Sequence, residues 1–353
     1  MTPKSSPSSS PVSIIIDENA AKPRIGFSLL VGILSFLIVL LFFASLAAGP
    51  VSISFFQILS SLKGGDQSLI HIIIEQIRLP RAILAITVGA TLGLAGAALQ
   101  GLLQNPLAEP GLIGVSGCAA LGAVIMFYTG ISAVFALALP LGGIVGALIA
   151  VVAIYGLAGR ESSILTLVLA GVAVNAFAAA LTTLALSLSP NPYAAFEIFF
   201  WLLGSLADRS LSHVYLSLPL MVLGWVLLLS MGRALDALTL GEDTARSLGF
   251  NLGRVQAQVV IGTALAVGAA VAISGIIGFV GLVVPHLLRP LVGYQPGKLL
   301  LVSALGGAVL TSAADIAVRF VMNGPELKLG VLTALIGAPF FLYLILQIRK
   351  EMR

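Results

Sequence analysis

The most constraining feature of the sequence is a long stretch without any charged side chain, from Arg81 to Glu109. It follows Arg78-Leu-Pro-Arg81 and ends in a polar loop, residues 104–111, that two prolines interrupt. A helix of this length crosses a hydrocarbon core of roughly 30 Å. Small residues recur at every fourth position within it: Gly89, Gly93, Ala97 and Gly101. Because lipid tails give helices no hydrophobic reason to associate, such a face predicts close packing inside a multi-helix membrane protein.

The composition extends this prediction to the whole chain. Apolar residues make up 59% of the sequence and charged residues 9%, against about 45–50% and about 25% in soluble domains. We therefore predict an all-α integral membrane protein. The net charge of +4 is spread over short loops, which argues against nucleic-acid binding. The single cysteine, Cys118, lies in an apolar Gly/Ala segment and is expected to serve packing.

Hydropathy divides the chain into a tail and a membrane domain. Residues 1–24 are rich in Ser and Pro and predict a disordered cytoplasmic tail, and residues 25–353 form the transmembrane domain. Residues 44–47 resemble a signal-peptidase site, but the apolar run before them is too long for a signal peptide, so an uncleaved span is preferred. Ten apolar segments follow: about 26–48, 82–104, 112–127, 134–157, 164–187, 214–232, 255–273, 276–288, 299–318 and 331–348.

The third and eighth segments are short and flanked by Gly and Pro, so we expect them to be tilted or to span only partly. Residues 198–206 predict an interfacial or re-entrant piece. An N-terminus on the inside places twelve of the 18 lysines and arginines on the cytoplasmic side, in accord with the positive-inside rule. Ten crossings then leave both termini cytoplasmic.

The few ionisable residues inside the apolar segments indicate how the protein could obtain energy if it pumps a solute. Asp315 is the only formal charge in the ten segments, and His286 the only imidazole. Ion-coupled carriers need ionisable groups near the midplane, and channels need charged rings or a carbonyl filter. The nearest approach to a nucleotide-binding loop, residues 293–298, has the wrong spacing. If the protein pumps, a partner must supply the energy.

Several motifs in order resemble the FecCD-type permeases of ABC importers for ferric siderophores, haem and cobalamin. They are the stretch 78–111, Trp201-Leu-Leu-Gly-Ser205-Leu, the segment Gly241–Gly249, Gly275 to Arg289 with Pro285-His286, and Thr333 to Phe341. The resemblance covers roughly residues 27–348. It implies a vitamin B12 permease-like bundle of about ten helices in the bacterial inner membrane. The subunit itself would not be an enzyme and would hold no cofactor or metal.

The same resemblance implies partners and cargo. Two ATPase subunits would carry ATP and Mg, an extracytoplasmic binding protein would deliver the cargo, and a second permease copy, identical or homologous, would complete the pore in the lipid bilayer. A ferric siderophore is favoured over haem or a corrinoid because that branch is the commonest. The alternatives are an ion-coupled secondary transporter and a non-transporting sensor or scaffold.

The segment 234–253 is expected to form a short cytoplasmic helix. Glu242 and Asp243 suit its first turn, Arg246 its last turn, and Gly249 a left-handed stop, with Ala245 and Leu248 forming a small apolar face. A short helix is unstable alone in water, so it should dock on another surface. The resemblance makes it the coupling helix that contacts the ATPase, through Gly241, Glu242, Ala245, Leu248 and Gly249. An amphipathic loop on the membrane surface is the alternative.

The arginines at the outer helix ends permit two interpretations. Arg78, Arg81 and Arg319 could anchor the helices at the interface by extending to lipid head groups. The resemblance instead assigns all three to docking of the binding protein through its glutamates. Asp315 could compete for Arg319, because the two residues are four apart.

The remaining motif residues are assigned to loops and to the transport pathway. Asn105, Pro106 and Pro110 break the backbone, Glu109 is placed at the cytoplasmic interface, and Pro285 should kink its helix and leave a carbonyl for His286 to bond. By resemblance, the fifth and tenth spans line the pathway and the loop 160–166 forms the gate. The residues assigned there are Asn175, Ser162, Ser163, Thr166, Gly330 and Pro339. One departure stands out, since Lys328 replaces the proline usual in the family.

Overall fold

The computed structural model describes residues 26–62, 69–135, 137–159, 164–189, 192–320 and 327–351, and every element in these ranges is helical. The ten main helices are α1 (Phe27–Ala47), α4 (Leu79–Leu102), α5 (Val115–Tyr128), α7 (Ala138–Ala158), α8 (Ile164–Ser187), α10 (Leu211–Leu229), α13 (Leu252–Ser274), α14 (Val280–Leu288), α15 (Pro296–Val318) and α16 (Leu329–Glu351). Within the described ranges, eight helices are long and apolar enough to cross a membrane. The expected short third and eighth segments are α5 and α14.

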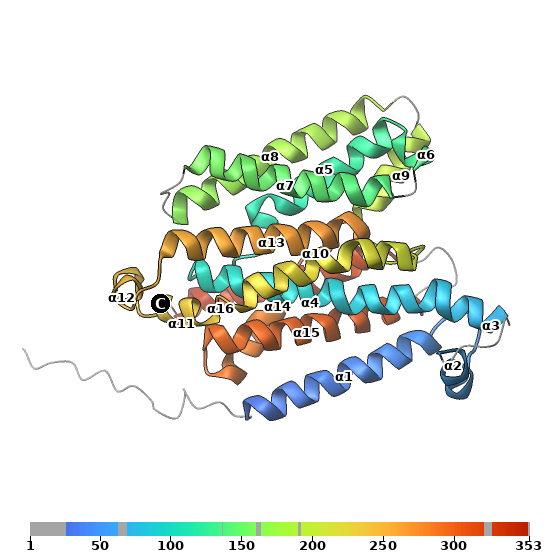
Figure 1. Ribbon diagram of the computed structural model, residues 1–353, viewed down its shortest axis with the longest axis horizontal. Coiled ribbons are helices and arrows are strands. Elements are labelled where there is room, and N and C mark those ends of the chain that lie inside the picture. The colour runs from blue at the N-terminus through green and yellow to red at the C-terminus, as the bar shows by residue number, and fades with distance from the viewer. Residues whose placement is uncertain are drawn as a thin grey trace, which may run out of the picture.

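Shorter elements connect the main helices. They are α2 (Phe55–Leu62), α3 (Leu69–Ile72), η1 (Ile73–Arg78), η2 (Pro110–Ile113), α6 (Ile131–Val134), α9 (Pro192–Leu202), α11 (Gly232–Leu238), α12 (Glu242–Ser247) and η3 (Arg289–Val292). The helices follow the long axis, with α11 and α12 at one end and α2, α3, α6 and α9 at the other (Figure 1). We call these the inner and the outer end. α1 begins and α16 ends at the inner end (Figure 1).

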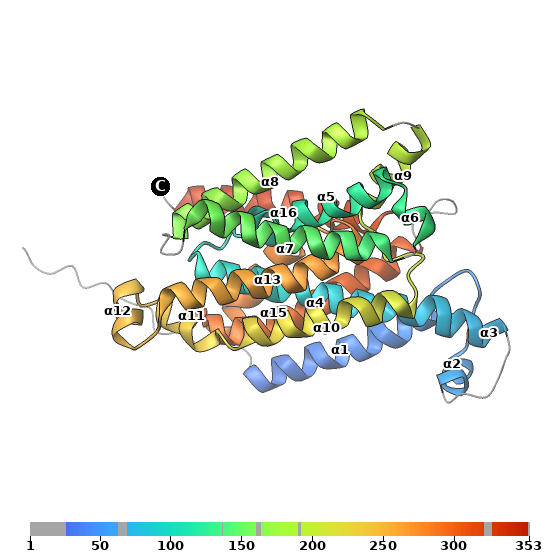
Figure 2. The same ribbon diagram turned by 45° about the horizontal axis from the view of Figure 1, so that its top comes forward.

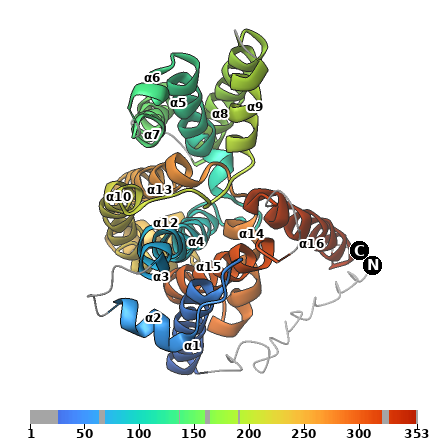
Figure 3. The ribbon, with the colours of Figure 1, turned by 90° about the vertical axis from the view of Figure 1, so that its right-hand side faces the viewer.

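Helix α4 lies in the middle of the molecule, with α10, α13, α14 and α15 close by, while α5 to α9 form a second group, whose α5 and α7 pack on α13 (Figures 2 and 3). Its small face packs on α15 as predicted. A Cβ atom added at Gly93 would lie 2.0 Å from the Ser303 carbonyl oxygen, and one at Gly89 would lie 2.3 Å from that of Gly307. Gly96, outside the predicted pattern, touches Gly281 of α14 in the same way. The absence of side chains at these positions lets the backbones meet.

The helix that carries Arg78 and Arg81 begins further out than the hydropathy indicated. Helical structure is continuous from Leu69 to Leu102, and η1 within it is a π-helix that ends just before Pro80. Proline has no N–H and its ring displaces the carbonyl four residues earlier. A π turn accommodates this without ending the helix.

The chain between α4 and α5 enters the bundle. Asn105 accepts a hydrogen bond from the Leu107 amide at 2.9 Å, and Pro110 starts η2 and contacts Gly281. Glu109 Oε1 accepts from the Phe279 amide at 2.6 Å, just before α14. The Phe279 ring packs on Gly337, which lies eight residues, roughly 12 Å, along α16. The placement of Glu109 at the cytoplasmic interface was therefore wrong, because its carboxylate caps a helix that begins inside the bundle.

Candidate functional site

At the outer end the three arginines of the docking prediction lie close to the end of α1. Arg78 is 4% exposed and donates to the carbonyl oxygens of Leu46 at 2.8 Å, Ala47 at 2.9 Å and Val51 at 2.6 Å. The carbonyl groups of Leu46 and Ala47 belong to the last turn of α1, where carbonyl oxygens have no amide partner within the helix. Val51 follows shortly after the helix. Arg78 therefore closes the turn after α1 rather than extending to lipid head groups.

Asp315 binds the other two arginines. Its carboxylate is fully buried and accepts from Arg81 Nε at 3.0 Å and from Arg319. Arg319 also donates to the Ser45 carbonyl oxygen at 2.8 Å. The competing pairing of Asp315 with Arg319 is confirmed, and docking of a binding protein by these three arginines stays a prediction.

At the inner end, α12 forms as expected. Glu242 and Asp243 occupy its first turn and pair with Arg246 at 3.0 and 3.2 Å, and Gly249 has a φ of +90°. The predicted apolar face is wrong in one respect. Ala245 is fully buried and faces the permease, whereas Leu248 is 60% exposed. The reason is that α12 folds back on α11, so only its far side offers an apolar contact to a partner.

The coupling segment is attached to the bundle through α11. Asp236 accepts from the Gly297 amide at 2.7 Å and from Gln295 Nε2 at 2.9 Å, at the start of α15. Gln104, after the end of α4, donates to the Leu238 carbonyl oxygen. Displacement of α11 would therefore act directly on α15 and on the end of α4.

The predicted pathway residues do not form one group. Gly330 and Pro339 line a cavity of about 610 Å³ between α16 and Phe279, with the Gly330 amide bonded to the Gly204 carbonyl oxygen at 3.2 Å. Asn175 instead turns its side-chain oxygen toward Gly117 of α5, and Thr166 is exposed near the inner end of α8. Ser162 and Ser163 lie outside the described residues.

His286 does not make the expected hydrogen bond. Its Nδ1 is buried without a partner, and its ring meets that of Phe340 edge to face at 5.6 Å. The imidazole thus serves as a packing contact between α14 and α16. No group of three or more His, Cys, Asp or Glu that could hold a metal occurs among the described residues.

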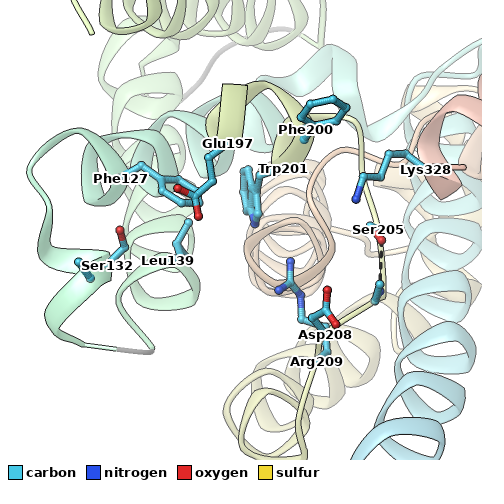
Figure 4. A pocket seen from close by; sticks show the side chains of 12 residues that line it. Phe127, Ser132, Leu139, Glu197, Phe200, Trp201, Ser205, Asp208, Arg209 and Lys328 are labelled. Atoms are coloured by element: carbon cyan, nitrogen blue, oxygen red, sulfur yellow. Dashed lines mark hydrogen bonds between the residues drawn. The ribbon is translucent and has the colours of Figure 1, made fainter. Parts of the chain in front are cut away.

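A second site at the outer end is a cavity of about 530 Å³, which we call the outer cavity (Figure 4). It is lined from α5, α6, α7, α9, the segment 205–209 and Lys328. Three aromatic side chains and four charged ones face it: Phe127, Phe200, Trp201, Glu197, Asp208, Arg209 and Lys328. The Arg209 guanidinium points toward Trp201, and Glu197 toward Phe127 (Figure 4).

Sequence reasoning missed several of these residues. Asp236 and Arg209 lie in polar stretches next to recognised motifs, and their partners are 61 and 64 residues away. Glu109 was expected at the cytoplasmic interface, and its contact with the Phe279 amide, 170 residues away, was missed. The sequence signal that could have located these residues is a charged side chain immediately beside a helix end, because such side chains commonly cap helices.

Taken together, the long apolar helices of the bundle define a class of protein, the polytopic α-helical membrane protein. Comparison with known proteins makes this specific. The FecCD transport family model matches residues 37–347, and the chain belongs to that family.

Relatives agree in kind and length. The hemin transport system permease protein HmuU of Yersinia pestis is 36% identical over 332 residues, which are 93% of this chain and 98% of HmuU. The vitamin B12 import system permease protein BtuC of Vibrio cholerae is 40% identical over 305 residues, 86% of this chain and 89% of BtuC. YvrB of Bacillus subtilis, an ABC transporter permease without an assigned cargo, is 40% identical over 289 residues, 80% of this chain and 81% of YvrB.

A solved structure supports the fold. It shows an inward-facing conformation of an ABC transporter assigned to the metal-chelate type, with a TM-score of 0.80 and 32% identity. The match covers 91% of this chain and 99% of that one. The chain is therefore an ABC importer permease of the FecCD type, a transport subunit, and the vitamin B12 permease-like fold is confirmed.

Proposed function

We propose that this chain forms the membrane pathway of a binding-protein-dependent importer for a metal chelate, driven by ATP hydrolysis on two partner ATPase subunits. The family match carries the proposal, and the exposed Leu248 on α12 supports it as an ATPase contact. A ferric siderophore is the proposed cargo, with haem and cobalamin as the other candidates because relatives are named for them. Both termini are proposed to be cytoplasmic, and two permease copies to line the pore.

Uptake by proteoliposomes that hold the permease, its ATPases and the binding protein tests this proposal. Radiolabelled ferric siderophores, haem and cobalamin are offered with and without internal ATP. We expect one cargo to accumulate only with ATP, and an uncoupler to have no effect while ATP is held constant. Uptake that follows an imposed ion gradient without ATP would establish the secondary-transporter alternative, and no uptake of any cargo would contradict the proposal.

Docking of the binding protein at Arg78, Arg81 and Arg319 also remains part of the proposal. Three arginines close together at the outer end favour an acidic partner, and such charges act mainly on encounter and register. The Arg78→Glu/Arg81→Glu variant must be compared at equal membrane level and equal thermal stability, because both side chains hold the fold together. Normal binding-protein affinity in a stably folded variant would refute docking by these residues.

A further inference from the structure

The outer cavity has the size of a ligand site and walls of mixed chemistry. Its volume of about 530 Å³ lies within the roughly 300–1,000 Å³ of small-molecule pockets. Separate segments of the chain contribute to it, so its shape depends on the tertiary fold (Figure 4). Neither the arginine cluster nor α12 contributes to its lining.

Arg209 is a fixed cation in this wall. Its Nε donates to the Ile273 carbonyl oxygen at 2.7 Å, in the last turn of α13, which anchors the side chain. A guanidinium has five N–H donors, and within the described ranges the other four make no hydrogen bond to protein. Burial lowers the pKa of Arg209, and neighbouring Asp208 opposes this effect. A half-buried guanidinium with spare donors is suited to acidic oxygens.

Trp201 provides an aromatic surface above the arginine. Phe127 supports it edge to face at a centroid distance of 6.4 Å. The indole N–H of Trp201 has no protein acceptor among the described residues. The other tryptophan, Trp225, donates to Thr91 Oγ1 at 2.8 Å. Trp201 thus presents both a π face and a donor to the cavity.

The four charged side chains around the cavity are not closely paired, although Asp208 acts electrostatically on Arg209. Glu197, Asp208, Arg209 and Lys328 form no ion pair within 4 Å in the part of the chain that the structure describes. Glu197 and Asp208 are exposed to solvent, whereas Arg209 and Lys328 are partly buried. An unpaired charge costs more free energy when it is removed from water. The two cations therefore gain more from a ligand than the two carboxylates do.

Lys328 adds a second cation to this site, at the position where the resemblance to the FecCD family leads us to expect proline. Its side chain lines the outer cavity, while its carbonyl oxygen accepts from the Val331 amide at 3.1 Å at the start of α16. The substitution adds a cation and leaves the helix start intact. A change of this kind alters recognition more than folding.

We propose that the outer cavity recognises the acidic edge of a planar, conjugated metal chelate, with Arg209 and Lys328 contacting its anionic oxygens and Trp201 stacking on its ring system. This inference rests on the proposed transport function. Within that function, the walls of the outer cavity favour a haem-like cargo over the ferric siderophore, which was favoured only because that branch of the family is the commonest. The cavity holds one edge of such a cargo, and the rest extends outward.

The test compares an acid with its ester. The permease–ATPase complex in lipid nanodiscs is titrated with iron(III) mesoporphyrin, which carries two carboxylates, with the dimethyl ester of the same porphyrin, and with cyanocobalamin. We expect Arg209→Gln and Lys328→Gln each to weaken binding of the diacid about tenfold or more, the loss expected for one charge-assisted hydrogen bond. Ester binding should change less than twofold, and Trp201→Ala should weaken both porphyrins.

Three controls separate the site from folding and from lipid partitioning. Arg254→Gln removes an exposed arginine at the inner end and should change nothing. Glu197→Gln removes a charge of the opposite sign from the same cavity and should not weaken the diacid. Lys328→Gln is informative even if Arg209→Gln unfolds, because no hydrogen bond or ion pair of the Lys328 side chain is lost among the described residues.

Equal affinity for the diacid and its ester, or unchanged affinity in both cation variants, would overturn the proposed site. Tighter binding of cyanocobalamin than of either porphyrin would overturn the ligand class. ATP-driven uptake of labelled chelates by the wild-type complex is measured alongside. Uptake without any effect of the variants refutes the site alone, whereas no uptake of any chelate refutes the proposed function.

Discussion

At the scale of single residues, Asp315 holds the outer end together. Its buried carboxylate lies between Arg81 of α4 and Arg319 of α15, and Arg319 extends to the end of α1. Removing one member of a buried ionic group leaves the others charged and unpaired, which costs about 3–5 kcal/mol. Replacing the whole group would cost much less.

We therefore expect Asp315→Ala to destabilise the protein by about 3–5 kcal/mol, because Arg81 and Arg319 each lose a buried carboxylate partner. Asp243→Ala removes an acid that is 99% exposed and should change stability by less than about 0.5 kcal/mol. Thermal unfolding in the same detergent compares the two. Equal melting temperatures would show that water or lipid head groups replace Asp315.

A glycine in α4 should be equally sensitive. The added side chain of Gly93→Ala would overlap the Ser303 carbonyl oxygen, and no rotation of a side chain can relieve a contact with backbone. Gly32→Ala in α1 places its methyl group in open space and is the matched control. We expect loss of at least about 2 kcal/mol for the first, by the cost of overpacking, and none for the second, measured as monodisperse protein after heating.

At the scale of elements, α11 and α15 form the mechanical link between the coupling segment and the bundle. The Asp236 carboxylate of α11 lies at the start of α15. Pro296 has no N–H group there, so the first amide that needs an acceptor is that of Gly297, which donates to Asp236. A carboxylate there also interacts favourably with the helix dipole. The same α15 reaches Asp315 at its other end, so one rigid helix connects the two ends of the molecule.

Asp236→Ala should accordingly separate ATP hydrolysis from transport. We expect transport per ATP hydrolysed to fall about fivefold or more, with ATPase binding retained, because α12 itself is unchanged. Asp236→Asn keeps an acceptor for Gly297 and should recover most of the coupling. A parallel fall of hydrolysis and transport would assign Asp236 to assembly instead.

At the scale of the whole molecule, the inner end offers an apolar contact to a partner on α12. Leu248 projects from α12 with 60% of its surface exposed, beside the Glu242–Arg246 pair. Leu248→Asp should reduce co-purification of the ATPase subunits about tenfold or more, while Leu248→Ala has a smaller effect. Thermal stability of the isolated permease should stay the same. Undiminished co-purification of Leu248→Asp would place the ATPase contact elsewhere.

Local sequence predicted most of the fold. Ten apolar segments correspond to ten helices, including the two short ones, because hydrophobic length and Gly/Pro breaks act within a segment. The short helix at Glu242 and its glycine stop followed from charges and backbone freedom within a few residues. The outward extension of α4 to Leu69 was missed, because residues 69–78 include His71 and Glu75 and do not form an apolar span.

The sequence by itself determined the membrane class, the family and the packing face of α4, since each depends on residue type and short spacing. Only the tertiary structure decided which charged groups meet partners that are distant in the sequence. Arg81 and Asp315 are 234 residues apart, and Glu109 reaches Phe279 across 170. Such contacts depend on how whole helices cross, and no local pattern encodes that crossing. For the same reason, only the fold brought Trp201, Arg209 and Lys328 to one cavity.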